Sequence, residues 1–375
     1  MNIFSKCKIG DVELSNHLAR SATWEGMAAE NGEVTDKLVS YYGTLAKGGV
    51  GLIISSHMYI EKTGRASPWQ IGIYDDSLVP GLARLAETAH SSKAKIFAQL
   101  SHGGCHAPLE LTGMPPFGVS AINTPYGGQA LAMSSTAVKN RIILFANAAA
   151  RAIEAGFDGI QLHCAHGFLI SQFLSPYYNK RNDEWGGTVE NRMRFLLETI
   201  LAVRLRIGNH PITLKLNASD FIEGGNEPEQ MLEIVKLLEN SGIDAIELSG
   251  GTVNHDGKYT STRTFDPASP ENEGYYIEEA QRYKQISQIP LILVGGFRSL
   301  ERISQILNDE IADFVSMGRP LVREPKLPKR WKSRKTDNKH RSECISCNGC
   351  GAAAMSGKGL KCVLKGKRNR LGVSA

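Results

Sequence analysis

Hydrophobic residues gather into short runs, separated by longer stretches in which apolar residues recur every three or four positions. Short continuous runs are typical of strands buried on both faces of a parallel sheet, and the wider spacing is typical of helices packed on one side. One helix is predicted from Val189 with Thr188 as its N-cap, and another starts with Pro228 at its first position. The predicted strands are residues 18–22, 50–55, 95–100, 159–163, 212–216, 245–248, 291–294 and 314–317.

These alternating strands and helices predict an α/β fold, a closed (β/α)8 TIM barrel. A doubly wound sheet fits less well, because no glycine-rich nucleotide-binding turn follows the first strand. Residues 102–136 after the third strand and 250–276 after the sixth are long enough to be lids over the catalytic end of the barrel. Residues 1–325 form the predicted barrel, and residues 326–375 a basic, Cys-rich C-terminal tail.

The composition is that of an ordinary globular protein, with 42% hydrophobic and 22% charged residues among 375. No apolar run is long enough to span a membrane, and the first residues lack the apolar core of a secretory signal, so a cytoplasmic protein is expected. The net charge of +5 comes from Lys and Arg in residues 326–341 and 358–370, which we interpret as a solvated surface rather than a nucleic-acid site. A homo-oligomer is compatible with the sequence.

Polar and glycine residues stand at the ends of the predicted strands, where barrel enzymes carry their chemistry. Glycines after the seventh and eighth strands, joined to an arginine, are typical of a phosphate site; they are Gly295, Gly296, Gly318 and Arg319. Lys215 lies in a largely apolar strand and needs an anionic partner, which a reduced flavin would supply. A Schiff-base lysine is the alternative, and amide donors such as Gln99 favour the flavin.

His163 and His166 end the fourth predicted strand and begin the turn after it, so both can reach one pocket. As metal ligands they would need further partners, and no matched carboxylate motif accompanies them. Two neutral imidazoles donating hydrogen bonds to a carbonyl or carboxylate oxygen fit equally well.

The segment from His163 to Phe195, HCAHGFLISQFLSPYYNKRNDEWGGTVENRMRF, resembles the signature of the Old Yellow Enzyme family of FMN-dependent NADH:flavin oxidoreductases and ene-reductases. The resemblance extends over about residues 3–325 through NHLARSAT, GGVGLIIS, KIFAQLSHGG, LKLNASD, LILVGG and FVSMGRPLVREP. It implies a (β/α)8 barrel, bound FMN and NAD(P)H as the reductant. It also implies that the flavin is held by Ala22, Thr23, Gln99, Lys215, Gly295, Gly296, Gly318 and Arg319.

By the same resemblance, His163 and His166 bind the activating oxygen of an electrophilic alkene, which receives a hydride from the flavin in a ping-pong reaction. The family usually places a proton-donating tyrosine where this chain has Phe168. The proton must then come from water or from another residue, and the candidates are Cys164, Tyr126, Tyr259, Tyr275 and Tyr276. Trp24 occupies a flavin-adjacent position where smaller residues are common.

Four cysteines follow the barrel at Cys344, Cys347, Cys350 and Cys362. Their spacing suits a [4Fe–4S] cluster or a zinc site, and an empty relic is the third alternative. It resembles the cysteine motif of 2,4-dienoyl-CoA reductase and trimethylamine dehydrogenase, which carry a further nucleotide-binding region. Because the sequence runs only to Ala375, it favours a separate electron carrier.

The sequence thus predicts an NAD(P)H-dependent enzyme that reduces an activated C=C bond. The alternatives are an amine dehydrogenase or demethylase, a tRNA-modifying flavin barrel, and a flavin redox carrier.

Overall fold

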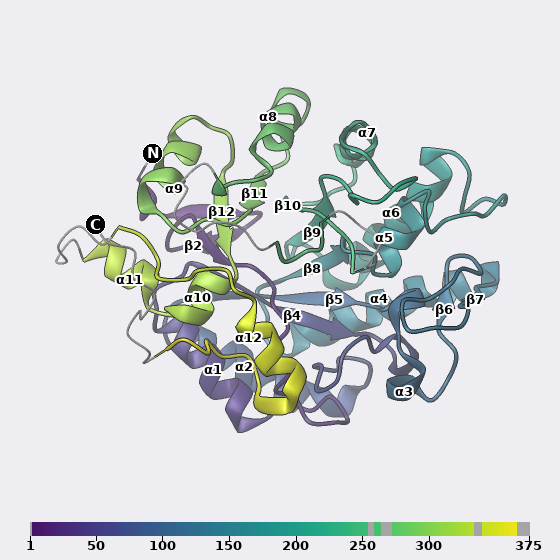
Figure 1. Ribbon diagram of the computed structural model, residues 1–375, viewed down its shortest axis with the longest axis horizontal. Helices are drawn as coiled ribbons and strands as arrows, with labels where there is room; N and C mark the ends of the chain where they lie inside the picture. The colour runs from purple at the N-terminus through teal and green to yellow at the C-terminus, as the bar shows by residue number, and fades with distance from the viewer. Residues whose placement is uncertain (1, 254–258, 264–271, 334–339, 366–375) are drawn as a thin grey trace.

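A parallel eight-stranded barrel forms the centre of the molecule (Figure 1). The computed structural model describes residues 2–253, 259–263, 272–333 and 340–365. Parts of the predicted second lid (residues 250–276) and of the basic stretches lie outside the described residues. The barrel closes in the order of its strands along the chain, which confirms the predicted (β/α)8 fold. The strands are β3 (Leu18–Arg20), β4 (Leu52–Tyr59), β5 (Lys95–Ser101), β8 (Gly159–Cys164), β9 (Ile212–Asn217), β10 (Ala245–Ser249), β11 (Leu291–Val294) and β12 (Phe314–Met317).

Helices cover the outside of the barrel and bury one apolar side against it. Thr188 caps α6 as predicted, since its side chain accepts a hydrogen bond from the backbone of Asn191. Pro228 begins α7, which ends at Leu238 rather than at the Gly242 expected from the sequence. The main outer helices are α1 (Asp36–Ala46), α2 (Val79–His90), α4 (Ser135–Glu154), α6 (Val189–Ile207), α7 (Pro228–Leu238), α8 (Ile277–Ile286) and α9 (Leu300–Asn308).

The amino end of the barrel is closed by an antiparallel pair, β1 (Cys7–Ile9) and β2 (Val12–Leu14). Ile9 and Leu14 join barrel residues such as Leu52 and Phe97 in a separate apolar cluster. With this end filled, the carboxyl end is left for a binding cavity.

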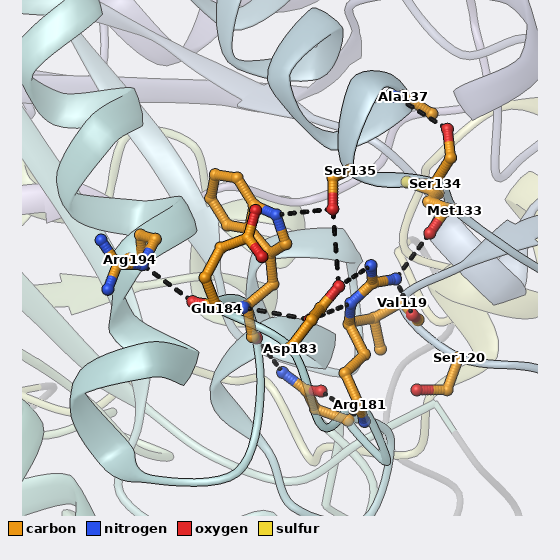
Figure 2. A network of polar contacts seen from close by, with 12 residues as sticks. Val119, Ser120, Met133, Ser134, Ser135, Ala137, Arg181, Asp183, Glu184 and Arg194 are labelled. Atoms are coloured by element: carbon orange, nitrogen blue, oxygen red, sulfur yellow. Dashed lines mark hydrogen bonds and ion pairs between the residues drawn. The ribbon is translucent and has the colours of Figure 1, made fainter.

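The first insertion carries α3 (Leu109–Thr112), β6 (Phe117–Gly118) and β7 (Leu131–Ala132). Arg181, in the loop after α5 (Leu169–Leu174), donates to the backbone oxygens of Val119 and Met133 at 3.0 and 2.6 Å (Figure 2). The same guanidinium pairs with Asp183, with Nη2 2.6 Å from Oδ2. One side chain therefore fastens the insertion to the barrel.

The chain after β12 forms α10 (Arg319–Arg323), α11 (Leu327–Lys332) and α12 (Gly349–Ala353), drawn in light green to yellow in Figure 1. It packs on the barrel: the backbone N–H of Leu360 donates to the oxygen of Glu25 at 2.8 Å, and Ala354 and Leu360 are buried. Among the helices that the structure describes, none is long and apolar enough to cross a membrane.

Candidate active site

A cavity of about 500 Å³ opens at the carboxyl end of the barrel. Gly295 does not line it, although the neighbouring Gly296 does. The structure brings the other residues predicted for the flavin and substrate together in its walls. They are Ala22, Thr23, Gln99, His163, His166, Phe168, Lys215, Gly296, Gly318 and Arg319.

Three imidazoles and one phenyl ring form a cluster in this cavity. The ring centres of His163 and His166 are 5.2 Å apart, and the Phe168 ring stacks on His163 at 4.4 Å. His57, which the sequence analysis missed, places its ring edge-on to Phe168 at 5.2 Å. The second strand was predicted to end at residue 55, whereas β4 continues through a register shift between Ile54 and His57. That irregularity carries His57 into the cavity.

Burial keeps these imidazoles neutral. Burial lowers the pKa of His57 to about 4. Burial also lowers the pKa of His163 and of His166, and the neighbouring imidazoles and the charge of Lys215 lower both further. A neutral imidazole has one N–H donor and one acceptor nitrogen. The cluster therefore suits a neutral carbonyl oxygen, to which each ring can donate one hydrogen bond.

His166 is held in an unusual conformation. Its φ of 65° is left-handed, a region that few residues other than glycine adopt. The N–H of His166 donates to Asn217 Oδ1 at 3.2 Å, and its carbonyl accepts from the N–H of Val253 at 3.1 Å. The ring contacts Ser249, with Nε2 2.8 Å from Oγ. Residues from β9, β10 and the second insertion thus fix this histidine.

Lys215 has a protein carboxylate as an anionic partner, which the sequence analysis did not anticipate. Its Nζ lies 2.9 Å from Glu247 Oε2, and both side chains are almost wholly buried. Burial would raise the pKa of Glu247, but the charge of Lys215 and a hydrogen bond from Ser316 hold it below its usual value. The sequence signal was present, since Glu247 is the charged residue of the apolar strand β10.

Gln99 continues this polar interior. Its Nε2 donates to Gln161 Oε1 at 2.7 Å, and Gln161 in turn donates to Glu247 at 3.1 Å. The amide oxygen of Gln99 has no hydrogen-bond partner among the described residues and is not enclosed, so it remains an acceptor on the cavity wall. An acceptor beside a lysine suits the N–H and carbonyl edge of a flavin.

The predicted phosphate residues surround one end of the cavity. Gly296 has a φ of 74°, and a Cβ added to Gly318 would lie 3.3 Å from Thr23 Oγ1, so both positions favour glycine. Nη1 of Arg319 donates to the carbonyl oxygen of Arg263 at 2.8 Å and to Asn348 Oδ1 at 2.6 Å. Arg319 thereby joins the second insertion to the cysteine segment.

The candidate proton donors separate into two groups. Tyr275 and Tyr276 line the cavity, whereas Tyr126, Tyr259 and Cys164 do not. Burial raises the pKa of both lining tyrosines, and the Arg263 guanidinium lies over their rings at 4.5 and 4.9 Å. Of the predicted proton donors, these two tyrosines are therefore the ones that line the cavity.

The four C-terminal cysteines line one smaller cavity of about 20 Å³. Within the described part of the chain they are free thiols, and no three metal-ligating side chains are arranged as a metal site. Cys350 and Arg319 line both this cavity and the large one. Met355 and Leu360 also contribute to the large cavity, so the segment predicted as an appended tail forms part of the candidate active site.

The closed barrel with a polar cavity at its carboxyl end defines a class, the (β/α)8-barrel enzymes. Residues 2–338 match the NADH:flavin oxidoreductase / NADH oxidase family, and the chain belongs to this family. A curated relative, NADH oxidase of Thermoanaerobacter brockii, is 36% identical over 378 aligned residues, which cover 99% of this chain and 57% of the relative. The chain thus spans a little over half the length of this relative.

Solved structures of related proteins are similar to this chain over most of its length. A 2-naphthoyl-CoA reductase has a TM-score of 0.89 at 26% identity, covering 96% of this chain and 56% of that one. A histamine dehydrogenase from Rhizobium has a TM-score of 0.86 at 27% identity, covering 96% and 51%. An Old Yellow Enzyme homologue from Zymomonas mobilis has a TM-score of 0.77 at 27% identity, covering 92% and 95%. The resemblance to the Old Yellow Enzyme family is confirmed.

Proposed function

We propose that this chain binds FMN and uses NAD(P)H to reduce an activated carbon–carbon double bond, as in an α,β-unsaturated carbonyl compound, in ping-pong order. The observation that carries the proposal is the pair of neutral imidazoles, His163 and His166, in the cavity that also holds Gln99 and Lys215. A polar donor pair beside an apolar wall suits a substrate with one activating oxygen.

The residues present fit FMN. The open amide oxygen of Gln99 and the ammonium of Lys215 would hold the polar edge of the ring. The ring would also contact Ala22 and Thr23, and the phosphate would lie by Gly296, Gly318 and Arg319, with Gly295 beside them. FMN supplies reversible hydride transfer when it is bound.

The side chains of this chain supply the rest of the chemistry. His163 and His166 each donate one hydrogen bond to the substrate oxygen and stabilise the negative charge that develops on it. Phe168 holds His163 by stacking and has no proton to give. The proton for the substrate carbon comes from Tyr275 or Tyr276, or from water.

Replacing both histidines tests the assignment. In His163→Ala/His166→Ala, kcat/KM for a cyclohexenone-type substrate should fall by on the order of a hundredfold or more, because two oxyanion donors are lost. FMN should remain bound. The control is His210→Ala, which removes an exposed histidine. Unchanged enone turnover in the double variant would show that the pair has another role.

Amine oxidation is the second candidate, favoured by the similarity to a histamine dehydrogenase. A primary or tertiary amine would then reduce the FMN-loaded protein under anaerobic conditions without NADH. Bleaching by amines and none by NADH would reverse the order of the two proposals.

We further propose that Cys344, Cys347, Cys350 and Cys362 hold a [4Fe–4S] cluster. Their shared cavity, with Arg319 and Arg323 in its wall, supports this, and the exposed Cys347 would bring the cluster close to a separate electron carrier. Anaerobically purified protein should contain about four iron and four acid-labile sulfide per chain. Near-zero iron with stoichiometric zinc would replace the cluster by a zinc site.

A further inference from the structure

The two ring nitrogens of His166 have different surroundings. Nε2 lies 2.8 Å from the hydroxyl oxygen of Ser249. Nδ1 has no hydrogen-bond partner among the described residues, and it is not among their enclosed, unpartnered polar atoms. It therefore keeps accessible surface, and His166 is one of the residues that line the large cavity.

His163 presents its other nitrogen. Its Nδ1 is enclosed and has no partner in the described part of the chain, so the nitrogen left for a ligand is Nε2. The stacked Phe168 ring, 4.4 Å away, fixes the plane of this imidazole. The candidate oxygen site is thus built from Nε2 of His163 and Nδ1 of His166.

His166 can donate a hydrogen bond to the substrate oxygen only if its single ring proton is on Nδ1. A neutral imidazole protonated on Nε2 would donate to Ser249 and turn a bare acceptor, Nδ1, toward the substrate oxygen, which would repel it. If the Ser249 hydroxyl donates to Nε2 instead, the proton is on Nδ1 and His166 becomes a donor. The geometry of the contact is the same in both cases.

The backbone of His166 is fixed, and the partner of its ring is buried. Asn217 and Val253 hold its backbone in the left-handed conformation, and Ser249 is the last residue of β10, 4% exposed. The contact with Ser249 is the hydrogen bond of the His166 ring within the described residues, so it is the contact that can select one tautomer.

We propose that Ser249 is a positioning residue that donates its hydroxyl proton to Nε2 of His166 and so keeps the proton of His166 on Nδ1, directed at the substrate oxygen. This inference rests on the proposed function, in which the two histidines bind that oxygen.

Nitrogen-15 NMR of the FMN-loaded protein, labelled at histidine, tests the tautomer without any substrate. The His166 signals are assigned by their loss in His166→Gln. We expect a protonated Nδ1 and an unprotonated Nε2 in the wild type, and loss of this single tautomer in Ser249→Ala. A wild-type His166 protonated on Nε2 would overturn the proposal.

Kinetics with cyclohexenone test the consequence. In Ser249→Ala, kcat/KM should fall by on the order of tenfold, the size of one lost hydrogen bond, and Ser249→Thr should restore it to within about twofold. Ser241→Ala, which removes a hydroxyl at the end of α7, should have no effect. Wild-type turnover by Ser249→Ala with FMN bound would refute the role. If the wild type reduces no enone yet shows the Nδ1 tautomer, the proposed function fails and the tautomer assignment stands.

Discussion

Burial decides what the cavity histidines can do, because it holds the imidazoles neutral and leaves each with a single donor. A cationic pair would bind a carboxylate strongly, whereas a neutral pair favours a carbonyl oxygen that gains charge only as the reaction proceeds. The residue beside them, Phe168, orients His163 by stacking and contributes no proton.

Restoring the missing hydroxyl should raise the rate of enone reduction. Phe168→Tyr adds a phenol to a ring that already lines the cavity. We expect kcat for cyclohexenone to rise by roughly a hundredfold, the low end of what a positioned acid contributes. Phe168→Leu, which removes the ring without adding a hydroxyl, should bring no gain. An unchanged kcat in Phe168→Tyr at full FMN content would mean that protonation is not slow in this enzyme.

The neutral histidines should make the protein less stable in acid. His57 has a folded pKa of about 4, against an ordinary value of 6.5. Between these values the unfolded chain binds the proton and the folded chain does not, so the free energy of unfolding falls as the pH falls. By pH 4, His57 alone lowers the free energy of unfolding by about 3 kcal/mol relative to pH 7.

Urea unfolding of the FMN-free protein at pH 7 and pH 4.5 measures this loss. His57→Phe removes the titrating group and should reduce the difference in unfolding free energy between the two pH values. An equal difference in wild type and variant would show that His57 is not buried as a neutral base.

At the scale of elements, much of the fold could be predicted because buried parallel strands are continuous apolar runs and helices between them are periodic. The positions of His163, His166 and Lys215 followed from those strands. His57 could not be placed, because the register shift within β4 leaves no mark in the apolar pattern. The packing of residues 349–360 on the loop after β3 was also beyond prediction, since it depends on tertiary contacts of a short, weakly patterned segment.

Charged residues within the segment from His163 to Phe195 have a structural role, and Arg181 is the example. Arg181 is 11% exposed and binds two backbone oxygens of the first insertion together with Asp183 (Figure 2). Arg181→Ala removes the donor to both backbone oxygens and the ion-pair partner of Asp183, and it should lower the free energy of unfolding by about 3 kcal/mol.

Arg194→Ala is the matched control, because Arg194 makes a more exposed hydrogen bond to the oxygen of Glu184. Its cost should be about 1 kcal/mol or less. Equal losses in the two variants, measured by urea unfolding, would show that Arg181 does not fasten the insertion.

At the scale of the whole molecule, the large cavity and the cysteine cavity share Cys350 and Arg319. The candidate site of the barrel and the cysteine segment, in which we propose a cluster, are therefore joined through common residues. This chain covers little more than half the length of several relatives, and those relatives therefore contain further regions.

The most direct test is the anaerobic visible spectrum of the purified protein loaded with FMN. Our account predicts a bound-flavin spectrum that bleaches on addition of NADH or NADPH and returns, mole for mole, when cyclohexenone is added. A protein that cannot bind FMN, or a reduced flavin that no enone reoxidises, would contradict it.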